Sequence, residues 1–365
     1  MAGERRLCPS RSYADLVPSD PQTPDHLPDP VTTPVLPGVV ATGVGSWPGE
    51  DVREALRVVR GELAPGQANG VATLPYLPEL PARGPGADMV GRTAQLLVDL
   101  PVDLQPQGWR LVDRPGRDVE RALALWAQDL DELAEAFDGH VGPLKVQVVG
   151  PWTMAAALWK PLGDKVLSDL GATRDLADSL AEGVSEHLRR VRTLVPGAQL
   201  VLQVDEPSLS AVLAGRIRSD SGYRTLRTPE QGEVQAALAR VLGQPAAAVC
   251  GAHCCAGDPP VDVLVGAGAH FLALDLTQLG GRRWEQVAVA HEDGVRLWAG
   301  LDLGAADPAE PLRRAWSELG LPVRDLGEVG VIPPCGLAGA SPDEALAGTR
   351  RVVELAARLA EESRG

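Results

Sequence analysis

Eight short apolar runs alternate with longer amphipathic stretches along the chain, and this alternation limits the folds that the sequence can adopt. Several runs are apolar at almost every position, as expected for strands that are covered on both faces. Strands that alternate with helices form a mostly parallel sheet, because each helix returns the chain to the edge where the strands begin. The predicted strands are Val39–Val44, Gly70–Pro75, Leu144–Val149, Leu200–Val204, Ala247–Ala252, His270–Leu274, Arg296–Gly300 and Val329–Pro333.

Eight strands interleaved with helices fit a (β/α)8 TIM barrel, which 365 residues with 44% hydrophobic content can build as one domain. A doubly wound open sheet has the same order of elements, and periodicity alone does not separate the two folds. No G-x-G-x-x-G follows the first predicted strand, which argues against a dinucleotide-binding sheet. We predict the α/β class, with a single TIM barrel over residues 37–365.

The first 36 residues differ in character from the rest of the chain. Residues 1–36 are rich in Pro, Asp, Ser and Thr and carry little periodic apolar content. Such a segment cannot bury enough surface to offset the entropy that it would lose on ordering. We therefore expect a disordered, Pro-rich leader at 1–36.

Charge and cysteine content narrow the choice of partners and of compartment. The net charge of −15 and the pI near 4.9 argue against nucleic acid or an anionic membrane as a partner. No apolar run reaches the ~18 residues that a membrane span needs, and the N-terminus lacks the apolar core of a signal peptide. The cysteine count of five is odd, which favours reduced thiols and a cytoplasmic location over a disulfide framework.

Polar residues of unusual character follow several predicted strands at the point where each strand ends. In a barrel, the carboxyl ends of all strands converge on one face, where the connecting loops build the active site. Segments far apart in the sequence are therefore predicted to line one pocket. These residues are Ser46, Glu79, Asp205, His253, Cys255, Asp275 and Cys335.

His253 and Cys255 are the strongest candidates for a metal site. An extended backbone points residues i and i+2 to the same side, so these two side chains can share an ion while Cys254 points elsewhere. With Asp275 and Cys335 they offer one imidazole, two thiolates and one carboxylate, a set that suits Zn²⁺ better than Mg²⁺ or Ca²⁺. The spacing is not that of a zinc finger, which favours a catalytic site assembled by the fold.

The remaining cysteines and histidines near the barrel have a simpler interpretation. Free cysteine packs as a small hydrophobic residue, so Cys250 and Cys254 are expected to be buried thiols. The other histidines lack neighbouring ligand residues, and we expect them on helix surfaces or in packing contacts. They are His140, His187, His270 and His291.

The carboxylates of Glu79 and of Asp205-Glu206 allow two interpretations. They can cap helices, or they can hold a substrate ammonium group at the mouth of the pocket. As a facing pair beside a metal, Glu79 and Asp205 favour the second interpretation. Gly45-Ser46 can offer backbone N–H groups to a substrate carboxylate.

Taken in order, these segments resemble the C-terminal catalytic barrel of the cobalamin-independent methionine synthase family. The resemblance covers about residues 38–363, and although each motif is short, their occurrence together in this order is specific. The family's I-G-S-F-P matches Val44-Gly45-Ser46-Trp47-Pro48 here, and its substrate glutamate matches Glu79, which precedes Asp88-Met89-Val90. Its G-P-x-T matches Gly150-Pro151-Trp152-Thr153, and its I-D-E-P matches Val204-Asp205-Glu206-Pro207. Its H-x-C matches His253 and Cys255, and its C-G-L matches Cys335-Gly336-Leu337.

The resemblance implies a zinc-dependent S-methyltransferase that makes methionine from homocysteine. Asp205 and Glu79 would hold the amino group of homocysteine, with Ser46 near its carboxylate, and zinc would bind its sulfur. A free thiol has a pKa of about 8.5, so little thiolate exists at neutral pH. Zinc coordination would supply the thiolate, which attacks the methyl group of a donor.

Three departures from the family bear on the methyl donor. Asp275 stands where the family has a glutamate ligand, and aspartate is shorter by one methylene, about 1.5 Å. Gly304 stands where the family has a proton-donating histidine. Long members also carry an N-terminal barrel that helps to bind folate, whereas only the 36-residue leader precedes the barrel here. These departures favour the short, barrel-only form and a corrinoid or corrinoid protein as donor over methyltetrahydrofolate, because a Co(I) leaving group needs no proton.

Two other functions stay open at this point. A barrel of the uroporphyrinogen decarboxylase type needs no metal and uses arginines and an aspartate near the first strand, but no arginine cluster follows Val44 here. A catalytically inactive barrel that binds a metal or a thiol amino acid is also compatible with Asp275 and Gly304.

Overall fold

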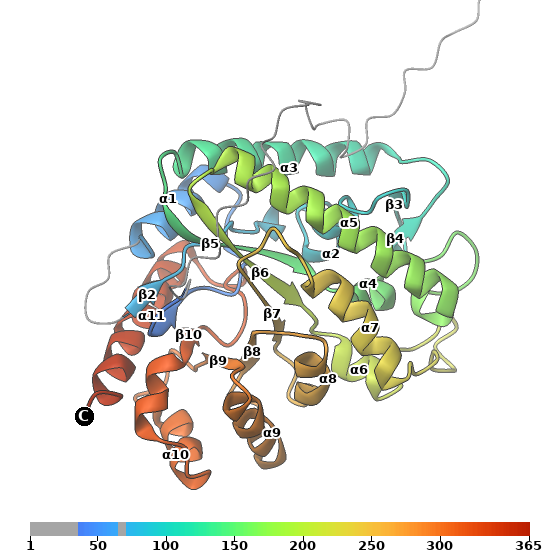
Figure 1. Ribbon diagram of the computed structural model, residues 1–365. Helices are drawn as coiled ribbons and strands as arrows, with labels where there is room; N and C mark the ends of the chain where they lie inside the picture. Colours follow the sequence, from blue (N-terminus) through green and yellow to red (C-terminus); the bar gives the residue numbers. More distant parts are fainter. Residues whose placement is uncertain (1–35, 65–70) are drawn as a thin grey trace, which may run out of the picture.

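The computed structural model describes residues 36–64 and 71–365, in which one parallel sheet of eight strands forms the centre of the molecule. The strand order is β2-β1-β10-β9-β8-β7-β6-β5, and the longer helices lie around the outside of the sheet (Figure 1). The sheet strands are β1 (Val39–Ala41), β2 (Val71–Thr73), β5 (Gly142–Val149), β6 (Ala198–Asp205), β7 (Val249–Cys254), β8 (Phe271–Asp275), β9 (Arg296–Gly300) and β10 (Gly330–Ile332).

Helices follow every strand of this sheet, which gives the repeated strand–helix order expected from the sequence. The α-helices are α1 (Val52–Glu62), α2 (Met89–Ala94), α3 (Arg117–Ala136), α4 (Pro151–Ala157), α5 (Leu170–Leu194), α6 (Leu209–Leu213), α7 (Gln231–Leu242), α8 (Val261–Gly266), α9 (Gly281–Glu292), α10 (Glu310–Glu318) and α11 (Pro342–Glu362). Short 3-10 helices occur at η2 (Pro81–Arg83), η3 (Val166–Ser168) and η4 (Val323–Glu328). Within the described residues, no helix combines the length and the hydropathy that a membrane span needs.

The sheet curls so that β1 and β10, its first and last strands along the chain, are neighbours. β1 pairs in parallel with both β2 and β10, an order typical of a barrel rather than of a doubly wound sheet. The two sheet edges approach each other just beyond β2, where Lys145 N donates to Pro75 O at 2.8 Å and Leu77 N donates to Lys145 O at 3.0 Å. The structure is therefore a curled, eight-stranded α/β fold consistent with a TIM barrel.

All eight predicted strands overlap strands of this sheet, but the region after β2 differs from the sequence-based expectation. Within residues 86–99 only α2 is helical, and it ends at Ala94. An antiparallel hairpin of β3 (Val102–Gln105) and β4 (Gly108–Leu111) was not predicted. Its Pro-Gln turn lacks the Asn-Gly or Asp-Gly pair that marks a short hairpin in a sequence. The leader predicted at 1–36 lies outside the described residues except for Leu36.

Successive side chains of each strand point alternately to the helices and to the interior of the curled sheet. On β6, Leu200, Leu202 and Val204 belong to the large outer core, whereas Val201 belongs to a smaller inner core. The inner core includes a stacked pair, Phe271 and Trp298. Toward the carboxyl ends the inward positions become polar, and this change places the candidate site. The inward polar positions are Lys145 and Gln147 on β5, Gln203 and Asp205 on β6, His253 on β7 and Asp275 on β8.

Candidate functional site

Asp205 and His253 lie side by side at the carboxyl ends of two adjacent strands. They are paired in the register of β6 with β7, and His253 Nδ1 lies 3.0 Å from Asp205 Oδ1. Both side chains are buried. His253 Nε2 is also buried and has no hydrogen-bond partner among the described residues. Histidines that bind metals commonly donate one ring N–H to a carboxylate and use the other nitrogen for the ion.

Cys255 and Cys335 come together from different loops, as the convergence of strand ends predicts. Their thiols share a hydrogen bond, which lowers the pKa of Cys335 to about 6 and raises that of Cys255. Nearby His253 also lowers the pKa of Cys335, and Asp275 raises it. All four predicted ligand residues therefore lie in one neighbourhood.

Cys254 faces away from this neighbourhood, as the alternation of the strand predicts. It is buried in the outer core, and its Sγ lies 4.0 Å from the hydroxyl oxygen of Ser210 on α6. Burial raises the pKa of its thiol to about 11. Cys250 is buried in the same core.

Asp275 is held by its own loop rather than by the other candidate ligands. Its Oδ1 accepts hydrogen bonds from the backbone and the hydroxyl of Thr277, at 2.9 and 2.6 Å, and its Oδ2 accepts one from Gln278 at 2.7 Å. Across residues 36–64 and 71–365, no three His, Cys, Asp or Glu side chains stand in ready metal-binding geometry. The structure thus gathers the predicted ligands without arranging them around a common point.

Ser46 and Glu79 lie on adjoining loops beyond β1 and β2. The two segments form a parallel bridge in which Trp47 N donates to Glu79 O at 2.7 Å. The loop that carries Cys335 packs against the same place, because a Cβ at Gly336 would come within 2.0 Å of Ser46 Oγ. Ser46, Glu79 and Cys335 therefore belong to one continuous wall of the site.

Glu79 is buried beside opposite and like charges. Burial raises the pKa of its carboxyl to about 7, Arg92 lowers it, and Asp205 raises it. Arg92 Nε lies 3.8 Å from Glu79 Oε1, and Gln147 Nε2 donates to the same oxygen at 3.3 Å. Asp205 is thus near enough to influence the charge of the Glu79 carboxyl.

Glu206, the neighbour of Asp205, has a structural role. Its carboxylate accepts hydrogen bonds from Trp152 N at 2.9 Å and from the backbone and hydroxyl of Thr153, at 2.8 and 2.7 Å. These groups form the first turn of α4, so Glu206 caps that helix. Glu206 thus caps a helix, whereas Asp205 faces the interior of the curled sheet.

The raised pKa of Glu79 gives a testable pH dependence. The folded protein holds the Glu79 proton more tightly than the unfolded chain, so its contribution to stability is complete below about pH 4.5 and is lost as pH rises through about 7. The glutamine of Glu79→Gln cannot ionise. Between about pH 5 and about pH 8, the free energy of unfolding should therefore fall by roughly 2 kcal/mol more in the wild type than in Glu79→Gln. Denaturant unfolding measures this difference. Glu285→Gln, at an exposed position of α9, is the control, and equal pH slopes for Glu79→Gln and wild type would contradict the burial argument.

Polar residues inside the curled sheet support these side chains and were not predicted from the sequence. Lys145, Gln147 and Gln203 are buried on β5 and β6, and each makes hydrogen bonds within the interior. A signal was present, because they interrupt apolar runs at every second position. The other four histidines of the described residues pack against aromatic rings or backbone: His140 on Phe137, His187 on Trp126, His291 on Trp316, and His270 on Cys250 O.

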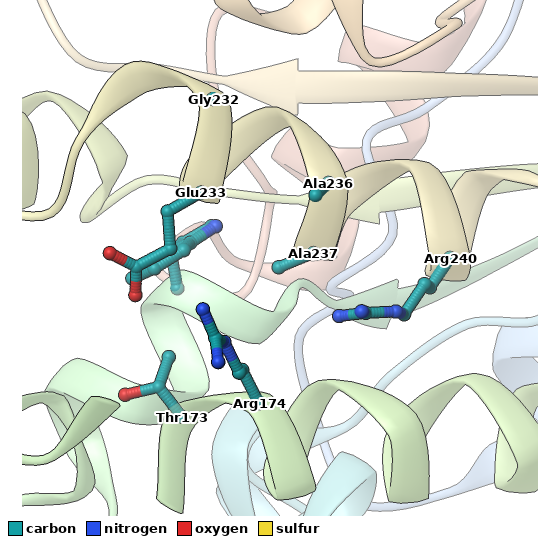
Figure 2. Close-up of a pocket in the computed structure, with 8 residues that line it drawn as sticks. Thr173, Arg174, Gly232, Glu233, Ala236, Ala237 and Arg240 are labelled. Carbon is teal, nitrogen blue, oxygen red and sulfur yellow. The ribbon is translucent and has the colours of Figure 1, made fainter. Parts of the chain in front are cut away.

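Two surface hollows lie away from these residues. One of about 400 Å³ lies between α5 and α7, where Arg174 faces Glu233 and Arg240 across the groove (Figure 2). The other, of about 380 Å³, lies between α1 and α3. Neither hollow is lined by a predicted site residue.

No protein-family model and no curated protein sequence matches the chain. Solved structures do match it. A methyltransferase from Methanosarcina mazei aligns with a TM-score of 0.53 and 14% sequence identity, over 90% of this chain and 94% of that one. The similarity is one of fold. A B12-independent methionine synthase from Shewanella sp. W3-18-1, in complex with selenomethionine, aligns with a TM-score of 0.44 and 14% identity, over 64% of this chain and 67% of that one.

Proposed function

We propose that the chain is a zinc-dependent methyltransferase that transfers a methyl group to the sulfur of homocysteine and forms methionine. The observation that carries the proposal is His253, whose Nδ1 lies against Asp205 while its buried Nε2 has no partner in the described residues. The Cys255–Cys335 thiol pair lies beside it. The order of motifs along the sequence and the fold shared with a methyltransferase add support.

The donor atoms suit zinc in chemistry, although they are not yet grouped around one point. His253 Nε2 and the sulfurs of Cys255 and Cys335 would hold the ion, which when bound would supply a Lewis acid that deprotonates a substrate thiol. Asp275 would have to release Gln278 from Oδ2 to become a further ligand. We therefore assign the fourth position to the substrate sulfur and propose that Asp275 acts from beyond the ligands, a change from the four-residue set predicted from the sequence.

Asp205 and Glu79 would bind the ammonium group of homocysteine. The hydrogen bonds that described residues make to the Asp205 carboxylate fall on Oδ1, which leaves Oδ2 for the substrate. A bound ammonium group would lower the pKa of Glu79 from about 7, because an opposite charge favours the ionised carboxylate. Ser46 would lie near the substrate carboxylate.

We propose a corrinoid as the methyl donor. Gly304 is exposed after β9, and its backbone N–H donates to Asp302 Oδ1 at 3.0 Å. Glycine has no side chain to protonate a leaving group, so a donor whose leaving group needs no proton is the better match. Methylcobalamin is such a donor, whereas methyltetrahydrofolate requires an acid.

A donor panel tests the proposal. Zinc-loaded protein and homocysteine are incubated with methylcobalamin, methyltetrahydrofolate or S-methylmethionine, and methionine is measured by mass spectrometry. We expect methionine with methylcobalamin and far less with methyltetrahydrofolate. Tight calorimetric binding of homocysteine without methionine from any donor would instead support the binding barrel that Asp275, held by its own loop, also allows. Decarboxylation of a tetrapyrrole would support the lyase.

A further inference from the structure

A chain of hydrogen bonds runs through the interior and ends at His253. Lys145 Nζ donates to Gln203 Oε1 at 2.9 Å, and Gln203 Nε2 donates to Asp205 Oδ1 at 2.7 Å. The same Asp205 oxygen lies 3.0 Å from His253 Nδ1. We call these four residues, Lys145, Gln203, Asp205 and His253, the interior relay. Three adjacent strands, β5, β6 and β7, supply them.

Lys145 is an unusual residue for this position. Its side chain is completely buried, and a buried lysine is costly unless its donors are satisfied. Its second hydrogen bond goes to Val44 O at 2.7 Å, and the Tyr76 ring covers it with the centroid 5.2 Å away. A Cβ at Gly43 would come within 2.5 Å of the Tyr76 hydroxyl, so the enclosure depends on a glycine.

The lysine determines the orientation of the Gln203 amide. An amide offers an oxygen acceptor at one corner and an NH2 donor at the other, whereas lysine Nζ makes these two bonds only as a donor. Lys145 therefore holds Oε1 toward itself and leaves Nε2 to face Asp205. If the amide turned over, its oxygen would face the Asp205 carboxylate, which cannot donate a hydrogen bond to it. The charged ammonium group has no lone pair with which to accept a hydrogen bond from a turned-over amide.

We propose that Lys145 is a positioning residue that, through Gln203 and Asp205, holds His253 with Nδ1 protonated and Nε2 directed into the site. The proposal rests on the proposed function only for the identity of the ion that Nε2 meets. Val44 O accepts hydrogen bonds from both Lys145 and Gln203, at 2.7 and 2.8 Å. Because Val44 leads into the loop of Ser46, the same lysine also fixes the wall on which a substrate carboxylate would bind.

The test measures the ring nitrogens of His253 in the metal-free protein, so it needs no turnover. Imidazole ¹⁵N spectra, in which the His253 signals are those missing from His253→Ala, should show a single Nδ1–H tautomer in the wild type. In Lys145→Met, which keeps the length of the side chain and removes both donors, we expect a mixture of tautomers. The affinity for Co²⁺, followed by its absorption, should fall about tenfold, at the low end of losses at residues that orient ligands.

The matched control is Val146→Ala, at the next residue of β5, which faces the outer core. It should keep the wild-type tautomer and Co²⁺ affinity even where it lowers stability. Gln203→Leu breaks the relay at its second member and should match Lys145→Met, and it decides the question if Lys145→Met fails to fold. A wild-type His253 spectrum in the folded relay variants would overturn the proposal. That result would not bear on the proposed methyl transfer. Conversely, a donor panel without methionine would not bear on the tautomer of His253.

Discussion

Replacing Cys255 with alanine is expected to lower the affinity for zinc by at least about 100-fold, whereas replacing the adjacent Cys254 should leave it unchanged. The reason is geometric. Cys255 shares a hydrogen bond with Cys335 near His253, while Cys254 is buried among apolar residues of the outer core. Residues i and i+1 of a strand point to opposite faces, so the two variants probe the two sides of one segment.

Metal analysis after dialysis and competition with a chromogenic chelator measure this difference. Cys335→Ser and His253→Ala should behave as Cys255→Ala does, because each removes one of the three proposed ligands. Cys254→Ala tests for a general effect of losing a cysteine, since it can lower stability while keeping zinc. Equal zinc affinity in Cys254→Ala and Cys255→Ala would contradict the assignment of the site.

Replacing Asp129 with alanine is expected to be the most destabilising of the changes considered, at about 3–5 kcal/mol. Asp129 on α3 is completely buried, and its carboxylate binds Arg83 Nη2 at 2.8 Å together with Arg92 Nη1. Without it, Arg83 would lose its buried counterion and Arg92 would keep only Glu79, at 3.8 Å. A loss of this size is a large part of the 5–15 kcal/mol that stabilises a typical domain.

The same change should also disturb the site. Arg92 lies over the Trp126 ring at 4.1 Å and faces Glu79, so Asp129 fixes the cation that tunes the Glu79 carboxyl. Denaturant unfolding measures the loss of stability, and Asp131→Ala, on the exposed face of the same helix, should leave the midpoint unchanged. A midpoint of Asp129→Ala close to that of Asp131→Ala would show that the buried network contributes little.

Much of the fold follows from the sequence because its strands are covered on both faces. Runs such as Leu200–Val204 are easy to recognise, because helices cover one face of the strand and the interior of the curled sheet covers the other. The β3–β4 hairpin was missed because its Pro-Gln turn is a weak local signal. The disordered leader predicted at 1–36 stays a prediction.

The candidate site was predictable in part. The positions at strand ends follow from a parallel sheet, and the opposite directions of Cys254 and Cys255 follow from the pleat. The engagement of Asp275 by Thr277 was missed, although an aspartate two residues before a threonine is a local turn signal. Lys145 was missed for a different reason, since its partners Gln203 and Val44 lie 58 and 101 residues away in the sequence.

The most direct test of the central claim is methionine formation from homocysteine and methylcobalamin by the full chain, with and without zinc. We expect turnover by the zinc-loaded wild type, its loss on chelation, its return when zinc is restored, and its absence from Cys255→Ala. Methionine formation that persists in the chelated protein would contradict the zinc-dependent site. So would zinc-loaded protein that forms no methionine from methylcobalamin, methyltetrahydrofolate or S-methylmethionine.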